Sequence, residues 1–121
     1  MTFKDSQHQE RYLQVLGKMR NQDNYHQAAA YLMALVPLKY SDVFDFESDG
    51  IKHEGIYAAW QTHSSRKATR LMFNLWNGCC QDYAAEEPEK TSTYYTVEEI
   101  FGNYEYAPYF YEAVRILNGW V

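Results

Sequence analysis

Residues 62–78, with the sequence THSSRKATRLMFNLWNG, decide the fold. At 100° per residue, the apolar side chains gather on one side of a helix, and these are Ala68, Leu71, Met72, Leu75 and Trp76. The opposite side carries a polar stripe made of Arg66, Arg70, Asn74 and Asn77. Hydroxyls in residues 62–65 can cap the start, and Gly78 marks the end. The pattern predicts an amphipathic helix with a buried face and a polar face free to meet a ligand or partner.

Two further helices are predicted upstream of this stretch. Ser6 and Gln9 have the spacing of a capping box and should open the first helix. Its expected apolar stripe consists of Tyr12, Leu13, Leu16 and Met19. Asp23 can cap the second helix, which Pro37 ends. We expect these two helices to pair as a hairpin.

The segment between the second helix and residue 62 is less regular. Residues 39–50 alternate aromatic with acidic side chains and turn at Asp49-Gly50, so a short strand and an irregular loop both fit, and the loop is favoured. From about Lys52, a third helix is predicted to carry Ile56, Ala59 and Trp60.

Two helices are predicted downstream. Residues 82–93 lack periodicity and are expected to form an exposed loop. Thr96 and Glu99 have capping-box spacing and start a short helix that stops near Gly102. Pro108 suits the first turn of a last helix over 109–117. The predicted fold class is all-α, a compact bundle of five or six short helices with an irregular or short β segment near residues 42–50, in a single domain over 1–121.

Composition restricts the class of protein. The net charge of -5 argues against a protein that coats nucleic acid, because such proteins gain affinity from basic side chains. No apolar run approaches the roughly 20 residues that span a bilayer, and no export signal begins the chain. The cysteines, Cys79 and Cys80, are adjacent and would form a strained ring rather than an ordinary disulfide. We therefore expect a cytoplasmic protein, without a membrane partner.

No pattern for catalysis or cofactor binding is recognisable. The cysteines and the four histidines lack the paired spacing of a zinc site, so no metal is predicted. Ser64 and Ser65 adjoin His63, but sequence neighbours rarely form a nucleophile and base pair, and helix capping explains them more simply. No catalytic residue and no cofactor is predicted, and an enzyme of unfamiliar type is left open.

An anion site is predicted at the start of the 62–78 helix. Hydroxyls, backbone amides and positive charge come together there, from Ser64, Ser65, Arg66, Lys67 and Arg70. Just upstream, Trp60 and Gln61 could add a stacking ring and an amide for a nucleotide-like ligand or an acidic protein patch. The alternative is an ordinary basic helix face paired with acids of the later loop or the last third.

The last third of the chain is acidic and aromatic. Residues 81–121 hold eight acidic and two basic side chains. Nine aromatic side chains lie within residues 94–120: Tyr94, Tyr95, Phe101, Tyr104, Tyr106, Tyr109, Phe110, Tyr111 and Trp120. Tyr104, Tyr106 and Tyr109 are predicted to anchor a partner protein, steered by Glu98, Glu99, Glu105 and Glu112 towards a basic surface. Packing of these rings in the core is the alternative.

Five motifs occur in a fixed order, namely DNYH at 23–26, FDF at 44–46, WQT at 60–62, FNLWNG at 73–78 and YAPYFYEA at 106–113. Because these motifs occur in this order, the chain resembles an uncharacterised family of small proteins. The family is a domain of unknown function carried by phages and conjugative elements of Gram-positive bacteria. The chain departs from the family's pattern at Lys52, where a proline is common, and is shorter after Asn118.

The resemblance implies a setting rather than a mechanism: the cytoplasm of a bacterial host cell, where accessory proteins of mobile elements often blunt host defences. The leading hypothesis is a non-enzymatic binding protein that blocks a host protein, in an anti-CRISPR or similar anti-defence role against an effector that handles nucleic acid. The alternative is a sponge that captures a nucleotide immune signal. A homodimer is left open.

Overall fold

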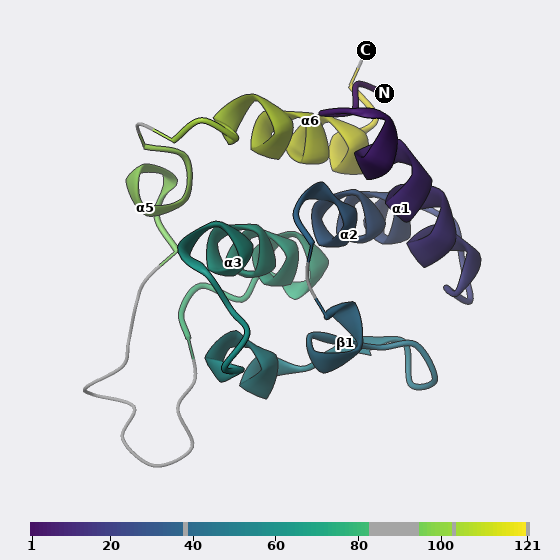
Figure 1. Cartoon of the computed structure of the whole chain (residues 1–121), viewed down its shortest axis with the longest axis horizontal. Coiled ribbons are helices and arrows are strands. Elements are labelled where there is room, and N and C mark those ends of the chain that lie inside the picture. Colours follow the sequence, from purple (N-terminus) through teal and green to yellow (C-terminus); the bar gives the residue numbers. More distant parts are fainter. Residues whose placement is uncertain (38, 83–94, 103, 121) are drawn as a thin grey trace.

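A computed structural model describes residues 1–37, 39–82, 95–102 and 104–120 (Figure 1). Within these ranges the chain is mostly helical, which confirms the predicted fold class. The α-helices are α1 (Ser6–Gly17), α2 (Asn24–Leu35), α3 (His63–Asn77), α5 (Val97–Phe101) and α6 (Ala107–Asn118). None of the helices in the described ranges is long and apolar enough to cross a membrane.

Helix α2 is the centre of the fold and packs against α1, α3 and α6 (Figure 1). Its sequence, NYHQAAAYLMAL, is apolar around most of its circumference, as expected for a helix with neighbours on several sides. Nine of its twelve residues are buried. Three successive alanines, residues 28–30, let the neighbouring helices approach closely, and Tyr31 beside them is fully buried.

The caps of the first two helices confirm one prediction and correct another. Asp23 caps α2 as predicted, since its carboxylate accepts a hydrogen bond from the His26 amide at 3.0 Å. Helix α1 is capped by Asp5, whose carboxylate accepts from the His8 amide at 2.7 Å, and the predicted cap Ser6 is wrong by one residue. The predicted stripe is also wrong at Leu13, which is exposed, because α1 turns a face of His8, Tyr12 and Val15 towards the core.

The segment between α2 and α3 is a short hairpin between two 3-10 turns, the first over Tyr40–Asp42 and the second over His53–Tyr57. Strand β1 (Phe44–Asp45) pairs antiparallel with β2 (Gly50–Ile51), where a loop had been favoured over a strand. The third helix predicted from Lys52 is a 3-10 turn, and Ala59 lies outside it in an exposed position. Gly55 is required there, because a Cβ would lie 2.1 Å from the Asp42 carbonyl oxygen.

Helix α3 follows its predicted bounds. Thr62 and Ser65 form a reciprocal capping box, and Gly78 ends the helix in the left-handed conformation at φ 79°. Its apolar side packs in the core, with Leu71, Met72 and Phe73 buried. The polar stripe meets Ile56 through Arg66 and residues 79–82 through its later members.

The C-terminal helices also begin and end near their predicted positions. Thr96 caps α5 by accepting from the Glu99 amide at 3.0 Å, and Gly102 follows the helix. Helix α6 has Pro108 in its first turn and Gly119 at its end. The predicted loop of residues 82–93 lies outside the described residues except for Asp82, which is buried and not exposed as predicted. Tyr94 also lies outside the described residues.

Candidate functional site

The start of α3 uses its polar groups for its own cap. The Ser65 hydroxyl donates to the Gln61 side-chain oxygen at 2.5 Å and accepts from the Thr62 amide at 2.7 Å. The amide group of Gln61 donates to the carbonyl oxygen of Gly55 at 3.1 Å. Gln61 and Ser65 are both buried. The hydroxyl and amide that were predicted to hold an anion are thus satisfied by neighbouring protein atoms.

Arg70 is committed to an ion pair with Asp82. Its Nη2 lies 2.9 Å from Asp82 Oδ2, and its Nε lies 3.3 Å from both carboxylate oxygens. The Asp82 side chain is 4% exposed, so the pair is largely withdrawn from water. The Tyr95 hydroxyl donates to the same carboxylate at 2.6 Å. Burial, followed by the hydrogen bond and charge of Asp82, raises the pKa of Tyr95.

The remaining members of the polar stripe also bond within the chain. The Arg66 Nε donates to the Ile56 carbonyl at 3.2 Å. The Asn74 amide donates to the Cys79 carbonyl at 2.9 Å, and the Cys79 amide donates to the Asn77 side-chain oxygen at 3.1 Å. Three members of the stripe therefore hold residues 79–82 against α3, and Arg66 holds the second 3-10 turn. The Arg70–Asp82 pair matches the alternative in which basic residues pair with acids of the same chain.

Trp60 is hydrogen-bonded to the first 3-10 turn and not to α3. Its indole N–H donates to an Asp42 carboxylate oxygen at 2.8 Å, and its ring is half-buried against the core. The structure therefore does not bring Trp60 and the arginines together as a set of free groups. Sequence reasoning missed Asp42 as a partner of Trp60. Asp82 belongs to the loop whose acids the alternative had allowed for, although no spacing singled it out as the partner of Arg70.

The predicted anchor tyrosines are half-buried. The Tyr104 ring lies 5.4 Å from the Tyr106 ring and 5.6 Å from the Phe110 ring. Tyr106 in turn contacts Tyr109 at 6.4 Å. Burial raises the pKa of the Tyr104 hydroxyl. Tyr111 is 59% exposed and Trp120 is 53% exposed, so the aromatic tail divides between core packing and surface.

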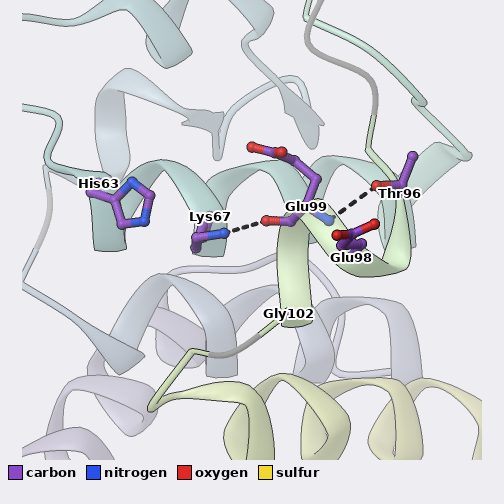
Figure 2. A pocket seen from close by; sticks show the side chains of 6 residues that line it. All are labelled: His63, Lys67, Thr96, Glu98, Glu99 and Gly102. Atoms are coloured by element: carbon purple, nitrogen blue, oxygen red, sulfur yellow. Dashed lines mark hydrogen bonds between the residues drawn. The ribbon is translucent and has the colours of Figure 1, made fainter.

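A recess of about 560 Å³ lies where α5 meets the first turns of α3, and we call it the α3–α5 recess (Figure 2). Its lining consists of His63, Lys67, Thr96, Glu98, Glu99 and Gly102. Lys67 is buried, and its ammonium group donates to the Glu99 carbonyl and lies 5.4 Å from the Tyr104 ring centre. Lys67 was predicted to belong to the anion site, but its ammonium group is bonded to a carbonyl oxygen of the same chain.

Three exposed residues of α5 form what we call the acidic surface of α5: Val97, Glu98 and Glu99, of which the two glutamates line the recess. Val97 is 77% exposed, more than any other large apolar side chain among the described residues. Neither glutamate carboxylate forms an ion pair with a described residue. In the same third of the chain, Arg115 is paired with the buried Glu112, so it does not neutralise them.

A smaller recess of about 280 Å³ contains both thiols. It is lined by His53, Asn77, Gly78, Cys79 and Cys80. Cys79 is buried, and burial raises the pKa of its thiol, which lowers the fraction of reactive thiolate. The Cys79 sulfur lies 4.0 Å from His53 Nδ1. Among the described residues, no group of three or more histidine, cysteine or acidic side chains could hold a metal ion.

Comparison with known proteins places the chain in a family without assigning it an activity. No curated protein and no solved structure matches it significantly. A family of unknown function, DUF6075, matches residues 1–119, which is nearly the whole sequence. The chain therefore belongs to the DUF6075 family of unknown function.

Proposed function

We propose that the chain is a non-enzymatic binding protein that blocks a basic partner protein with the acidic surface of α5. The observation that carries this proposal is the exposure of Val97 beside two carboxylates that have no cationic partner among the described residues. An exposed apolar side chain adjacent to charged ones is typical of a protein interface, in which the apolar group is desolvated and the charges select the partner.

Contacts around the acidic surface of α5 hold this helix in a fixed position. Lys67 ties α3 to the carbonyl oxygen of Glu99, and the Thr96 cap fixes the first turn of α5. The Tyr104 ring supports the Lys67 ammonium group from the adjoining segment. A preorganised surface loses less conformational entropy when a partner binds, so more of the contact energy appears as affinity.

The partner that we propose is a host protein that handles nucleic acid, such as a defence effector. Proteins of this class hold phosphates with lysine and arginine side chains. Carboxylates on a rigid helix would compete for those side chains and occupy the surface that nucleic acid needs. The anti-defence role and the origin in a phage or conjugative element rest on the resemblance described above.

The nucleotide sponge is the weaker candidate on geometric grounds. It requires Arg70 and Asn74 to meet a ligand, whereas Arg70 is paired with Asp82 and Asn74 holds the Cys79 carbonyl. A nucleotide would have to break both contacts and leave a buried carboxylate without its cation. No contact in the described residues favours this candidate over the first.

Affinity capture with charge-reversed variants tests the proposal. The immobilised chain is used to recover proteins from a bacterial host lysate, with mass spectrometry to identify them. The test variant carries Glu98→Lys and Glu99→Lys. We expect the parent to recover a basic, nucleic-acid-binding protein reproducibly and the variant to lose it, because two attractive charges become repulsive.

The matched control carries Glu10→Lys and Glu47→Lys, which makes the same change in net charge at two exposed positions on α1 and the hairpin. The control should capture the same partner as the parent. Recovery of no reproducible partner, or equal capture by both variants, would contradict the proposal. Circular dichroism of each variant separates loss of binding from loss of fold.

A further inference from the structure

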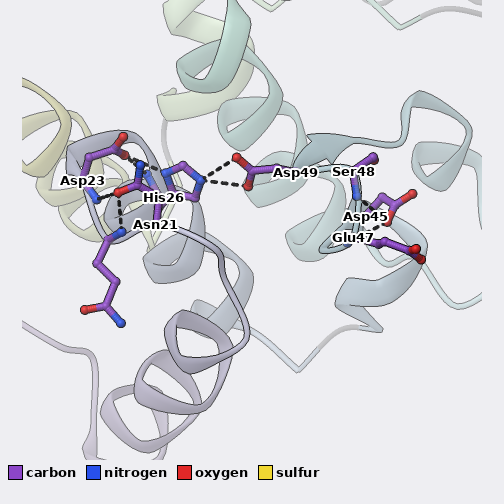
Figure 3. Close-up of polar contacts among 8 residues, drawn as sticks. Asn21, Asp23, His26, Asp45, Glu47, Ser48 and Asp49 are labelled. Atoms are coloured by element: carbon purple, nitrogen blue, oxygen red, sulfur yellow. Dashed lines mark hydrogen bonds and ion pairs between the residues drawn. The ribbon is translucent and has the colours of Figure 1, made fainter.

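His26 is held on two sides by carboxylates from different elements (Figure 3). Its Nδ1 lies 2.7 Å from Asp23 Oδ1, at the start of α2. Its Nε2 lies 2.8 Å and 3.0 Å from the two carboxylate oxygens of Asp49, in the turn between β1 and β2. The ring is buried, and only a protonated imidazole can donate a hydrogen bond from both nitrogens.

The groups that face His26 favour the charged ring. Asp23 and Asp49 are the charged groups in contact with it, and the neighbour on α3 is the uncharged Trp76, whose ring centre lies 4.9 Å away. Burial lowers the pKa of His26, but the hydrogen bonds and charges of Asp23 and Asp49 outweigh it, so the pKa lies above its usual value of 6.5.

The two carboxylates would respond differently to loss of the proton. Asp23 also accepts from the His26 backbone amide at 3.0 Å, so its place at the cap of α2 does not depend on the ring. Among the described residues, His26 is the hydrogen-bonding partner of the Asp49 carboxylate. Asp49 is in the left-handed region at φ 60°, which aspartate tolerates in turns, so the turn itself does not require the contact with His26. The contact with Asp49 is therefore the one that breaks.

We propose that Asp23, His26 and Asp49 form a pH-sensitive latch, which fastens the hairpin of residues 44–51 to the start of α2 while the imidazole is protonated and releases it when the proton leaves. The hairpin carries Phe44, whose ring packs 5.1 Å from Trp76 and 5.1 Å from Phe46. Release would loosen this aromatic cluster as well as the turn that contains Asp49.

The sign of the pH dependence follows from the direction of the pKa shift. A histidine whose pKa is raised by folding stabilises the folded state most below its unfolded pKa of about 6.5, and this contribution is lost as pH rises through the folded pKa. The latch is therefore closed in mildly acidic solution and opens towards alkaline pH.

Nuclear magnetic resonance of the full chain tests the latch. The imidazole signals of His26 report its protonation between about pH 5 and about pH 9. The Lys52 amide, which donates to the Val43 carbonyl at 2.9 Å, reports the base of the hairpin through its hydrogen-exchange protection factor. We expect the His26 midpoint above 6.5 and a fall in Lys52 protection of about tenfold across that midpoint, the change expected for one lost charge-assisted hydrogen bond.

Two variants show whether the charge of Asp49 raises the His26 midpoint and links it to the protection of Lys52. Asp49→Asn keeps the size and the tolerance of a left-handed backbone but removes the charge. It should lower the His26 midpoint and abolish the change in Lys52 protection. Asp45→Asn is the control, because Asp45 lies in the same hairpin and accepts from the Glu47 and Ser48 amides rather than from His26. It should leave the midpoint unchanged.

The parent protein alone can overturn the proposal, even if a variant fails to fold. A His26 midpoint at or below 6.5 would show that the carboxylates do not hold the proton. Equal Lys52 protection on both sides of the midpoint would show that the proton does not hold the hairpin.

Discussion

The polar stripe of α3 and the acidic surface of α5 look alike in the sequence but serve different purposes in the structure. Both are charged or polar faces of capped helices. In α3, Arg70 meets Asp82 and Asn74 holds Cys79, so the stripe stabilises the fold. In α5, Glu98 and Glu99 face solvent without an ion pair among the described residues. Charge on a helix is available to a partner only where the rest of the chain does not neutralise it.

Burial accounts for the energetic difference between the two regions. The side chains of Arg70 and Asp82 are 15% and 4% exposed, so each depends on the other for the solvation that water no longer supplies. Exposed carboxylates remain hydrated and contribute little to stability. Substitutions in α3 should therefore change the free energy of unfolding, and those in α5 should change partner binding.

The largest effect is expected from Asp82→Ala. The substitution leaves the Arg70 guanidinium largely buried without its counter-ion and removes the acceptor of the Tyr95 hydroxyl. We expect a loss of about 3–5 kcal/mol in the free energy of unfolding, measured by urea denaturation. A loss below about 1 kcal/mol, the range of exposed pairs, would remove the distinction between the two regions.

Asn74→Ala should have a smaller effect of about 1–3 kcal/mol, because it leaves the Cys79 carbonyl without its donor. Gln14→Ala is the control, since Gln14 is exposed on α1 and the change should stay within about 0.5 kcal/mol. If the two variants unfold at the same urea concentration, Asn74 does not serve the fold as described.

Removal of the threonine caps of α3 and α5 compares how much each helix contributes to stability. Thr62→Ala should lower global stability by about 1 kcal/mol, because α3 is a fifteen-residue helix with much of one face in the core. Thr96→Ala should lower it less, because α5 has five residues and Ile100 is its buried one, so the helix can open locally. Thermal unfolding and amide exchange distinguish the two, and a larger global loss for Thr96→Ala would reverse our ranking.

The smallest effect on stability is expected from Glu98→Ala. Glu98 is exposed and forms no ion pair among the described residues, so the free energy of unfolding should change by less than about 0.5 kcal/mol. The same variant should capture less of the partner in the affinity experiment. A stability loss near that of Asp82→Ala would mean that α5 is a structural element and not a binding surface.

Local signals in the sequence predict the helices well. Thr62, Gly78 and Thr96 mark helix ends through side-chain and backbone chemistry that acts within a few residues. Asp5 and Ser6 are both good caps, so adjacent positions are hard to distinguish without the tertiary contact that selects one. The hairpin was harder to predict because two-residue strands give too little alternation to exceed the signal of a loop.

Which particular acid pairs with each candidate site residue could not be predicted from the sequence. Arg70 and Asp82 are twelve residues apart, and Asp82 begins a stretch without periodicity, so nothing local indicates that it is buried. Asp42 and Trp60 are eighteen residues apart, and no local pattern links these two residues either. By contrast, Glu98 and Glu99 could be identified as a candidate acidic surface, because the surplus of acids in the last third is visible in composition alone.

A double-mutant cycle on Arg70 and Asp82 tests the contrast between the two regions most directly. Urea denaturation of Arg70→Ala, Asp82→Ala and the double variant gives the coupling energy between the two side chains. We expect the double variant to be much more stable than the sum of the single losses predicts, with a coupling of about 1–3 kcal/mol. Additivity within about 0.3–0.5 kcal/mol would show that the pair contributes nothing to the fold, and would return the polar stripe of α3 to the status of a free surface.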